Sequence, residues 1–257
     1  MKIIAIIPAR MGSSRFPGKP MAKIHGIPMI GHCYYRTKMC DSLLETYVAT
    51  CDQEIYDYII SIGGRAIMTL DSHERACDRT AEAMLKIERE LGFDVDIVVM
   101  VQGDEPMVTP SMISDAITPL RNNSDINVVN LMAKIDTIEE FQDANEVKVV
   151  VNKRNEAIYF SREPIPSLRK GADNVRMLKQ VCIIPFKRDY LLKFNDMEET
   201  ELERIESVDM MRIIENSGKV KMVITNQPIF SVDTEKDRKA VEIRMKNDST
   251  MISYNRK

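Results

Sequence analysis

The residues with the most evident chemistry lie in the loop that follows the first apolar segment, residues 3–7. This loop combines cationic side chains with glycines and serines. The cations can offset the charge of phosphate oxygens, while backbone N–H groups and hydroxyls donate hydrogen bonds to the same oxygens. The composition therefore predicts a site for a triphosphate. The residues that we expect to form it are Arg10, Gly12, Ser13, Ser14, Arg15, Gly18 and Lys19.

The loop differs from the common phosphate-binding patterns. Gly12 and Gly18 are one residue too far apart for the sequence G-x-x-x-x-G-K-[ST], and Pro20 stands where that pattern has a serine or threonine for magnesium. The pattern G-x-G-x-x-G is absent as well. The alternative interpretation is a surface loop, rich in Gly and Pro, whose basic residues are incidental.

Two aspartates each follow an apolar stretch and are the candidate metal ligands. Asp104 comes after residues 97–101, with Gly103 before it to allow close approach of the backbone to a ligand, and Asp233 follows Val232. Magnesium bound to a nucleotide takes one or two protein carboxylates besides phosphate oxygens and water. We expect Mg²⁺ at Asp104 and Asp233, with Asp237 as the alternative second ligand. In the competing interpretation Asp104 forms a turn and Asp233 caps the last helix.

Composition excludes several classes of protein. With 36 basic and 39 acidic residues the net charge is −3, so no basic surface indicates nucleic acid as a partner. The longest apolar runs are far shorter than the ~20 residues of a membrane helix, and no export signal opens the chain, so we expect a cytoplasmic protein with no membrane partner. The five cysteines are widely spaced and form no C-x-x-C pair, which argues against a disulfide framework and a zinc site.

The first half of the chain alternates between two patterns. Short, wholly apolar segments predict strands, and longer segments with helical periodicity predict helices. Strands without alternation of polar and apolar residues are typical of a parallel sheet covered by helices on both faces, so the pattern predicts a doubly wound α/β fold with ligands beyond the carboxyl ends of the strands. The predicted strands are 3–7, 46–49, 65–68 and 97–101, and the predicted helices are 29–39, 53–62, 78–91 and 111–120.

The second half has a different pattern. Strands separated by short polar turns predict an antiparallel insertion, which we place at residues 126–200 inside a single domain that spans residues 1–257. Residues 167–175 are expected to form a mobile loop, and an acidic helix is expected from 195 to about 216. The strands predicted for this half are 126–134, 147–151, 156–161, 180–186 and 219–224, and a final helix begins at 235.

Several segments, in order from residue 3 to about 245, resemble the 3-deoxy-manno-octulosonate cytidylyltransferases, also called CMP-Kdo synthetases. Together they are far more specific than any one of them. The resemblance implies a Rossmann-like nucleotide-diphospho-sugar transferase fold. The segments are 6–20 (IIPARMGSSRFPGKP), 26–30 (GIPMI), 48–50 (VAT), 102–106 (QGDEP), 147–149 (VKV), 159–162 (YFSR) with 165–166 (IP), 202–206 (LERIE) and 232–234 (VDT).

The resemblance implies that a hydroxyl of a sugar acid attacks the α-phosphate of CTP in the presence of magnesium, giving a CMP-sugar and pyrophosphate. It places the triphosphate at Arg10, Ser13, Arg15 and Lys19, the cytidine at Gln102, and the metal at Asp104 and Asp233. Arg10, Lys19, Asp104 and Asp233 are then the catalytic residues, and His73 and Arg79 belong to the nucleotide site. No protein nucleophile is needed for this reaction.

The resemblance also implies a site for the sugar acid. Arg162 matches a position expected to bind the sugar carboxylate, and Glu206 matches an acid expected to accept hydrogen bonds from sugar hydroxyls. From the residues alone, Arg162 can equally end a surface strand beside an acid, and Glu206 can lie on a solvated helix face.

Two segments depart from the family pattern. Residues 73–79 (HERACDR) keep His73 and Arg79 but lack the Ser-Gly-Thr that approaches the nucleotide in the family. In residues 179–186 (KQVCIIPF), Gln180 stands where the family has a histidine near the sugar, which changes the hydrogen-bonding pattern and hence the acceptor that fits.

These departures leave two alternatives open: activation of another sugar acid, such as a nonulosonic acid, or a module that binds nucleotide sugars without turnover. The resemblance further implies a homodimer, which is also the commonest closed assembly.

Overall fold

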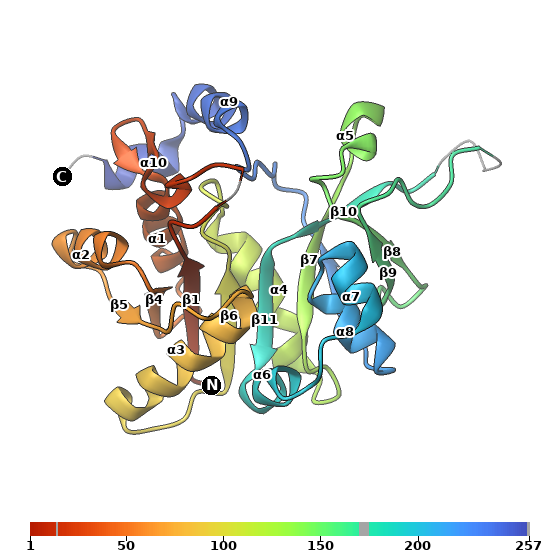
Figure 1. Cartoon of the computed structure of the whole chain (residues 1–257), viewed down its shortest axis with the longest axis horizontal. Helices are drawn as coiled ribbons and strands as arrows, with labels where there is room; N and C mark the ends of the chain where they lie inside the picture. Colours follow the sequence, from red (N-terminus) through yellow and green to blue (C-terminus); the bar gives the residue numbers. More distant parts are fainter. Residues whose placement is uncertain (14, 170–174, 256–257) are drawn as a thin grey trace. The chain divides into compact units, whose positions relative to one another are not determined.

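In the computed structural model of the chain, residues 1–13, 15–169 and 175–255 are described. They form two compact units, the first made of residues 1–114 and 228–257 and the second of residues 115–227 (Figure 1). Part of the loop predicted over 167–175 lies outside the described residues, so its mobility stays a prediction. Ser14, predicted to bind the triphosphate, also lies outside them.

A parallel sheet lies at the centre of the first unit (Figure 1). Strand β1 (Ile3–Ala9), in which every residue is buried, pairs with β4 (Glu45–Thr50) on one side and with β6 (Ile97–Val101) on the other. Strand β5 (Ala66–Met68) extends the sheet beyond β4, so these strands follow the order β6-β1-β4-β5, all parallel. The predicted parallel arrangement of apolar strands is confirmed.

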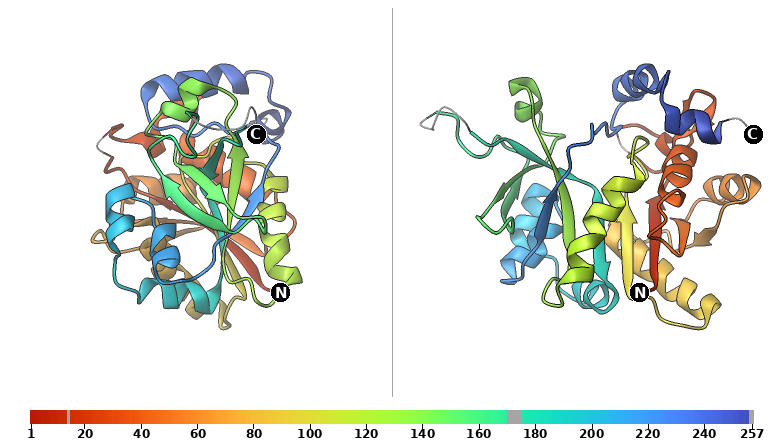
Figure 2. Two further views of the ribbon diagram at one scale, coloured as in Figure 1. Left: turned by 90° about the vertical axis from the view of Figure 1, so that its right-hand side faces the viewer. Right: turned by 180° about the vertical axis from the view of Figure 1, so that it is seen from behind.

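Helices connect these strands and cover the sheet. Helix α1 (Met29–Lys38) lies on one face and α3 (Ala76–Leu91) on the other, as the two opposite views show (Figures 1 and 2). Helix α2 (Gln53–Ser61) joins β4 to β5, and α4 (Pro110–Asn122) follows β6. The four helices predicted for the first half of the chain therefore all exist, with ends that differ by one or two residues.

Short elements between β1 and α1 pack against the C-terminal helices of the chain. They are the 3-10 helix η1 (Lys19–Met21) and the hairpin of β2 (Lys23–Ile24) and β3 (Ile27–Pro28). The C-terminal helices α9 (Glu235–Met245) and α10 (Ser249–Tyr254) pack here, and α10 was not predicted. The buried core that they share consists of Ile24, Met29, Val232, Val241, Met245, Met251 and Tyr254.

The second unit has its own sheet. Strands β7 (Val129–Lys134), β10 (Leu178–Val181), β8 (Lys148–Val151) and β9 (Ala157–Ser161) pair in that order, each antiparallel to the next. Strand β12 (Lys221–Ile224) joins the other side of β7 and runs parallel to it. The predicted antiparallel pairing is thus found, with one parallel strand added at the edge.

The single strand predicted over 180–186 is wrong. The segment forms β10 and β11 (Ile183–Lys187), which separate at Cys182. At that point the side-chain amide of the buried Asn130 donates to the Val181 carbonyl at 2.7 Å, and Phe186 pairs with Val128 by an isolated bridge. The apolar run therefore forms two strands instead of one, and the side chain of Asn130 on β7 bonds to the backbone where the strands separate.

The long acidic helix predicted from 195 to about 216 is also wrong. Two shorter helices, α7 (Glu201–Glu206) and α8 (Met210–Glu215), occupy this region, and a third, α6 (Arg188–Asn195), ends where the predicted helix begins. Ser207 ends α7 in the left-handed conformation with φ 53°, which a continuing helix does not allow. Helix α5 (Ile138–Gln142) is a further short element that follows β7.

Across residues 1–13, 15–169 and 175–255, none of the helices has both the length and the apolar character needed to cross a membrane.

A buried histidine links α1 to the end of the chain. His32 is 0% exposed; its Nε2 donates to the Ile24 carbonyl at 2.8 Å, so its Nδ1 accepts from the Tyr254 hydroxyl at 2.7 Å. Burial lowers the pKa of His32 to about 4. The neutral imidazole is the form that this position stabilises.

We expect the unfolding free energy to fall as the pH drops from about 6.5 towards 4, because the unfolded state then binds a proton that folded His32 does not. The loss should approach ~1.4 kcal/mol per pH unit. Urea unfolding across this range tests it. His32→Gln should show a flatter dependence, and equal slopes for wild type and His32→Gln would contradict the assignment.

Candidate active site

One ammonium group joins two carboxylates in the first unit. Lys19 Nζ lies 2.8 Å from Asp104 Oδ2 and 3.4 Å from Asp233 Oδ1. The Arg15 guanidinium lies 2.9 Å from the same Asp233 oxygen. The structure therefore brings together four of the residues predicted to bind triphosphate and metal.

The parallel sheet explains this convergence. The loop with Lys19 follows β1 and the loop with Asp104 follows β6, and these adjacent parallel strands end at the same edge of the sheet. Asp233 reaches this edge because the Val232 N–H donates to the Asp104 carbonyl at 3.0 Å, which fixes the segment before α9.

Electrostatics favour the charged form of Lys19. Burial by itself lowers the pKa of Lys19, but the neighbouring carboxylates of Asp104 and Asp233 outweigh burial and raise the pKa above its usual value. The lysine is therefore a permanent cation in this site, able to hold a phosphate oxygen in place of a carboxylate.

A backbone hydrogen bond joins the two ends of the loop after β1. The Gly18 N–H donates to the Met11 carbonyl at 3.1 Å, and Gly18 has φ 71°, which favours glycine. Inside the loop, Ser13 Oγ accepts from the Phe16 N–H at 3.3 Å. Arg10 is exposed at the start of the loop.

Gly103 has a different role from the one expected. A Cβ at this position would lie 3.1 Å from the Pro8 carbonyl oxygen and 3.2 Å from Ile30 Cδ1. The close approach that glycine allows is therefore to β1 and α1 rather than to a ligand. The Cys33 thiol of α1 also donates to the Gly103 carbonyl at 3.4 Å, which supports the loop that carries Gln102 and Asp104.

The two alternatives for the second carboxylate are separated by their contacts. Asp237 Oδ2 accepts from the Thr234 N–H at 2.8 Å, the Thr234 hydroxyl at 2.8 Å and the Asp233 N–H at 3.2 Å. Asp237 thus completes a capping box in which Thr234, not Asp233, caps α9. The suggestion that Asp233 caps this helix is wrong, and its carboxylate faces Lys19 and Arg15 instead.

This donor set suits a hard cation bound together with a polyphosphate. Two carboxylates share one ammonium, and carboxylate pairs of this kind bind magnesium with phosphate oxygens and water as the remaining ligands. No group of three or more His, Cys, Asp or Glu ligands is found in the part of the chain that the structure describes.

His73 and Arg79 organise the loop before α3. Arg79 is 2% exposed and donates to Thr69 Oγ1 and to the carbonyls of Leu70 and His73. His73 Nε2 lies 2.6 Å from Glu82 Oε2. These contacts give both residues a structural function, and their part in nucleotide binding stays a prediction.

In the second unit, Arg162 and Glu206 lie together. Arg162 Nε donates to the Glu206 carbonyl at 2.8 Å and Nη1 donates to the Ala144 carbonyl at 3.0 Å. The Glu206 carboxylate accepts from the Arg162 N–H, the Ser161 hydroxyl and the Tyr159 hydroxyl. Both predicted sugar-binding side chains therefore also hold β9 against α7.

Gln180 lies on β10 and is tied to the neighbouring strand. Its Nε2 donates to Asn130 Oδ1 at 2.6 Å. The amide nitrogen of Asn130 donates in turn to the carbonyls of Leu131 and Val181. The orientation of the Gln180 amide is set by this chain of hydrogen bonds.

Two supporting residues escaped the prediction from sequence. Asp52 Oδ2 accepts from the Met11 N–H at 2.8 Å and so anchors the loop after β1. Lys148 is 0% exposed and donates to the carbonyls of Asp143, Glu146 and Arg162. The one available signal was a lysine inside an otherwise apolar strand, which is unusual enough to indicate a specific buried contact.

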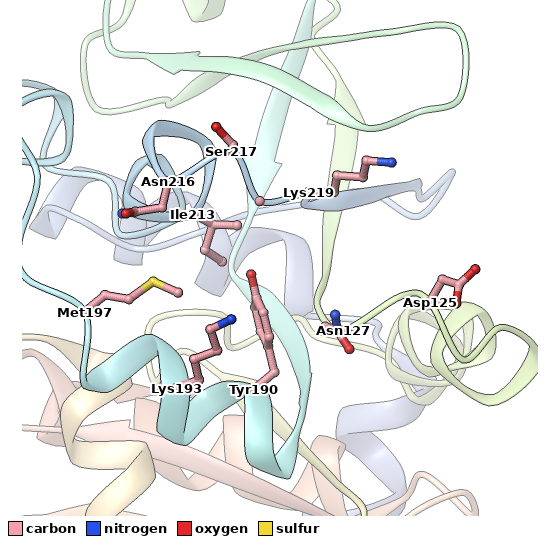
Figure 3. Close-up of a pocket in the computed structure, with 10 residues that line it drawn as sticks. Asp125, Asn127, Tyr190, Lys193, Met197, Ile213, Asn216, Ser217 and Lys219 are labelled. Carbon is pink, nitrogen blue, oxygen red and sulfur yellow. The ribbon is translucent and has the colours of Figure 1, made fainter.

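A cavity of about 330 Å³ lies elsewhere in the second unit, between α6, α8 and the start of β7 (Figure 3). Tyr190 and Lys193 line it from α6, and Asn216 and Lys219 line it from the segment after α8. None of the predicted site residues lines this cavity.

Comparisons with known proteins agree with the geometry. A model of the cytidylyltransferase family matches residues 4–240. The chain is 40% identical over 247 residues to a 3-deoxy-manno-octulosonate cytidylyltransferase of Geobacter metallireducens, covering 92% of this chain and 95% of that relative.

Solved structures show the same fold. A CMP:2-keto-3-deoxy-manno-octonic acid synthetase complexed with CTP matches with a TM-score of 0.87 and 36% identity, covering 95% of this chain and 98% of that chain. A 4-diphosphocytidyl-2C-methyl-D-erythritol synthase from Anaerococcus prevotii matches with a TM-score of 0.61 and 13% identity, covering 95% and 98% of the two chains, and shares the fold alone.

The fold is that of the nucleotide-diphospho-sugar transferases, a class in which nucleotidyl groups are transferred from a triphosphate. The chain belongs to the 3-deoxy-manno-octulosonate cytidylyltransferase family.

We expect Asp52→Ala to weaken the binding of inorganic tripolyphosphate about tenfold, because the loop after β1 loses the anchor at the Met11 N–H. Titration calorimetry measures this. Asp57→Ala, an exposed carboxylate on the same helix, is the control and should bind as the wild type does. Equal affinities for Asp52→Ala and wild type would show that the anchor does not shape the phosphate site.

Proposed function

We propose that the chain transfers a cytidylyl group from CTP to 3-deoxy-manno-octulosonate with the help of Mg²⁺. The observation that carries this proposal is the convergence of Lys19, Asp104 and Asp233 at the edge of the parallel sheet. The named activity of relatives at about 40% identity supports the nucleotide and the acceptor.

In the proposed reaction, an oxygen of the sugar acid forms a bond to the α-phosphorus of CTP while the bond to the bridging oxygen of pyrophosphate breaks. The proton of the attacking hydroxyl goes to solvent, and pyrophosphate leaves. Arg10, Ser13, Arg15 and Lys19 bind and orient the triphosphate, and Gln102 contacts the cytosine. Positioning of the partners and stabilisation of charge supply most of the rate in this class of reaction.

Asp104 and Asp233 would hold the magnesium ion. When bound, the ion supplies charge that stabilises the phosphate oxygens and favours ionisation of the attacking hydroxyl. For triphosphate and metal to bind, Lys19 and Arg15 exchange carboxylate partners for phosphate oxygens, since each can pair with either anion.

The sugar acid is assigned to Arg162, Gln180 and Glu206 in the second unit, and His73 and Arg79 are assigned to the nucleotide site. The homodimer, the cytoplasmic location and a sugar-binding and dimerisation role for residues 126–200 remain parts of the proposal. A related 3-deoxy-ulosonic acid is the second candidate acceptor, because Gln180, which stands where the family has a histidine, is fixed by Asn130 and offers a different hydrogen-bonding pattern.

Release of pyrophosphate by the purified protein tests the proposal. The assay contains Mg²⁺, each of CTP, UTP, ATP and GTP, and an acceptor panel of Kdo, 8-amino-Kdo and sialic acids. We expect release with CTP and Kdo. Release only with CTP and another acid would favour the second candidate, and binding of CTP without release for any acceptor would favour the non-catalytic module.

Asp104→Asn should lower the rate of pyrophosphate release about a hundredfold or more, because the amide removes a charged metal ligand. The fold should persist, since the amide oxygen can still accept from Lys19. Circular dichroism and thermal melting check the fold, and Asp115→Asn, which is exposed on α4, serves as the control. An unchanged rate in Asp104→Asn would remove Asp104 from the metal site.

A further inference from the structure

A buried acid next to Asp104 contacts the segment that carries Asp233. The Ser231 hydroxyl donates to Glu105 Oε1 at 2.7 Å, and Glu105 is only 5% exposed. The Val232 N–H donates to the Asp104 carbonyl at 3.0 Å beside this bond. Two adjacent hydrogen bonds thus join residues 104–105 to residues 231–232.

The location of these bonds matters more than their number. Glu105 directly follows Asp104, and Ser231 precedes Asp233 by two residues. The bond between them therefore acts within two residues of each carboxylate that faces Lys19. On the opposite side, the Asp233 N–H is held by Asp237 and hence by α9. The bond between Ser231 and Glu105 directly joins a side chain of the loop that carries Asp104 to a side chain of the segment that carries Asp233.

The carboxyl group of Glu105 is buried, unlike that of most glutamates. Burying a carboxyl group costs free energy that only its hydrogen bonds offset, so a buried acid at this place is a poor source of stability by itself. Its hydrogen bond instead fixes geometry. A protein site that offers two carboxylates binds a metal well only when the surrounding residues hold both carboxylates in place.

We propose that Glu105 and Ser231 are positioning residues that set the separation of the Asp104 and Asp233 carboxylates for a divalent cation. The inference rests on the proposed function, because it takes these two aspartates as the metal ligands. Glu105 and Ser231 do not themselves bind the metal, the nucleotide or the sugar acid. They act through the backbone of residues 104 and 231–233.

The test measures binding of Mn²⁺ in the presence of CTP and without any acceptor, so that no turnover is needed. Electron paramagnetic resonance counts the free Mn²⁺, and the same mixture of Mn²⁺ and CTP without protein gives the amount that CTP alone binds. We expect Ser231→Ala to raise the apparent Kd for Mn²⁺ about tenfold, the effect of losing one hydrogen bond that organises a site. Binding of CTP in EDTA should stay within twofold of the wild type.

Variants of Glu105 separate positioning from bulk stability. Glu105→Gln keeps an oxygen that accepts from Ser231 and should bind Mn²⁺ within about twofold of the wild type, whereas Glu105→Ala should bind Mn²⁺ at least as weakly as Ser231→Ala does. The double variant should be no weaker than Glu105→Ala, because both changes remove the same bond. Ser253→Ala, whose hydroxyl bonds only to its own helix at Thr250, is the matched control.

Steady-state kinetics give a second measure. In Ser231→Ala the Mg²⁺ concentration for half-maximal pyrophosphate release should rise about tenfold, and kcat at saturating Mg²⁺ should recover to within about threefold. A lower melting temperature with an unchanged Kd for Mn²⁺ would show that the bond only stabilises the fold, and would overturn the inference. If the wild type with CTP does not bind Mn²⁺, the metal site of the proposed function fails as well.

Discussion

Two carboxylates that face each other across a narrow site repel unless a cation lies between them, and Lys19 supplies that cation. The rest of the first unit serves this contact. Lys19, Asp104 and Asp233 lie in three segments that are far apart in the sequence, and only the shared edge of a parallel sheet brings the first two together. The site therefore already holds paired charges, and in the proposed function the binding of triphosphate and metal is an exchange of ionic partners.

Each loop at this edge has a contact that fixes its backbone. Asp52 accepts from the loop after β1, the Cys33 thiol donates to the loop after β6, and Ser231 bonds to Glu105. None of these residues is among the expected ligands of a nucleotide or metal. Their common effect is to limit the conformations open to the charged side chains. Ligand binding then costs less conformational entropy, because these side chains are already ordered.

The second unit shows why residue type alone is a weak guide to a binding residue. Arg162 and Glu206 hydrogen-bond extensively to the backbone around them, and the buried Lys148 donates to the carbonyl of Arg162. Buried polar groups must find partners, so a charged side chain near a sugar site is commonly part of the framework too. Gln180 belongs to the same kind of network through Asn130. Any ligand here meets polar groups whose directions are already set.

The sequence by itself determined the parallel sheet, its helices, and the group of Arg15, Lys19, Asp104 and Asp233, because wholly apolar strands and the loops that follow them are local features.

Only the tertiary structure decided the boundaries of those elements that depend on contacts between residues far apart in the sequence. The Asn130 amide breaks an apolar run into β10 and β11, Ser207 ends a helix that the pattern extends, and α10 becomes a helix against a core from the other end of the chain. The contacts of the two aspartates were likewise decided there, because Thr234 bonds to the Asp237 carboxylate while the Asp233 carboxylate faces Lys19. Hydrogen bonds and packing between segments far apart in sequence leave no periodic signal, so no pattern along the chain could have shown them.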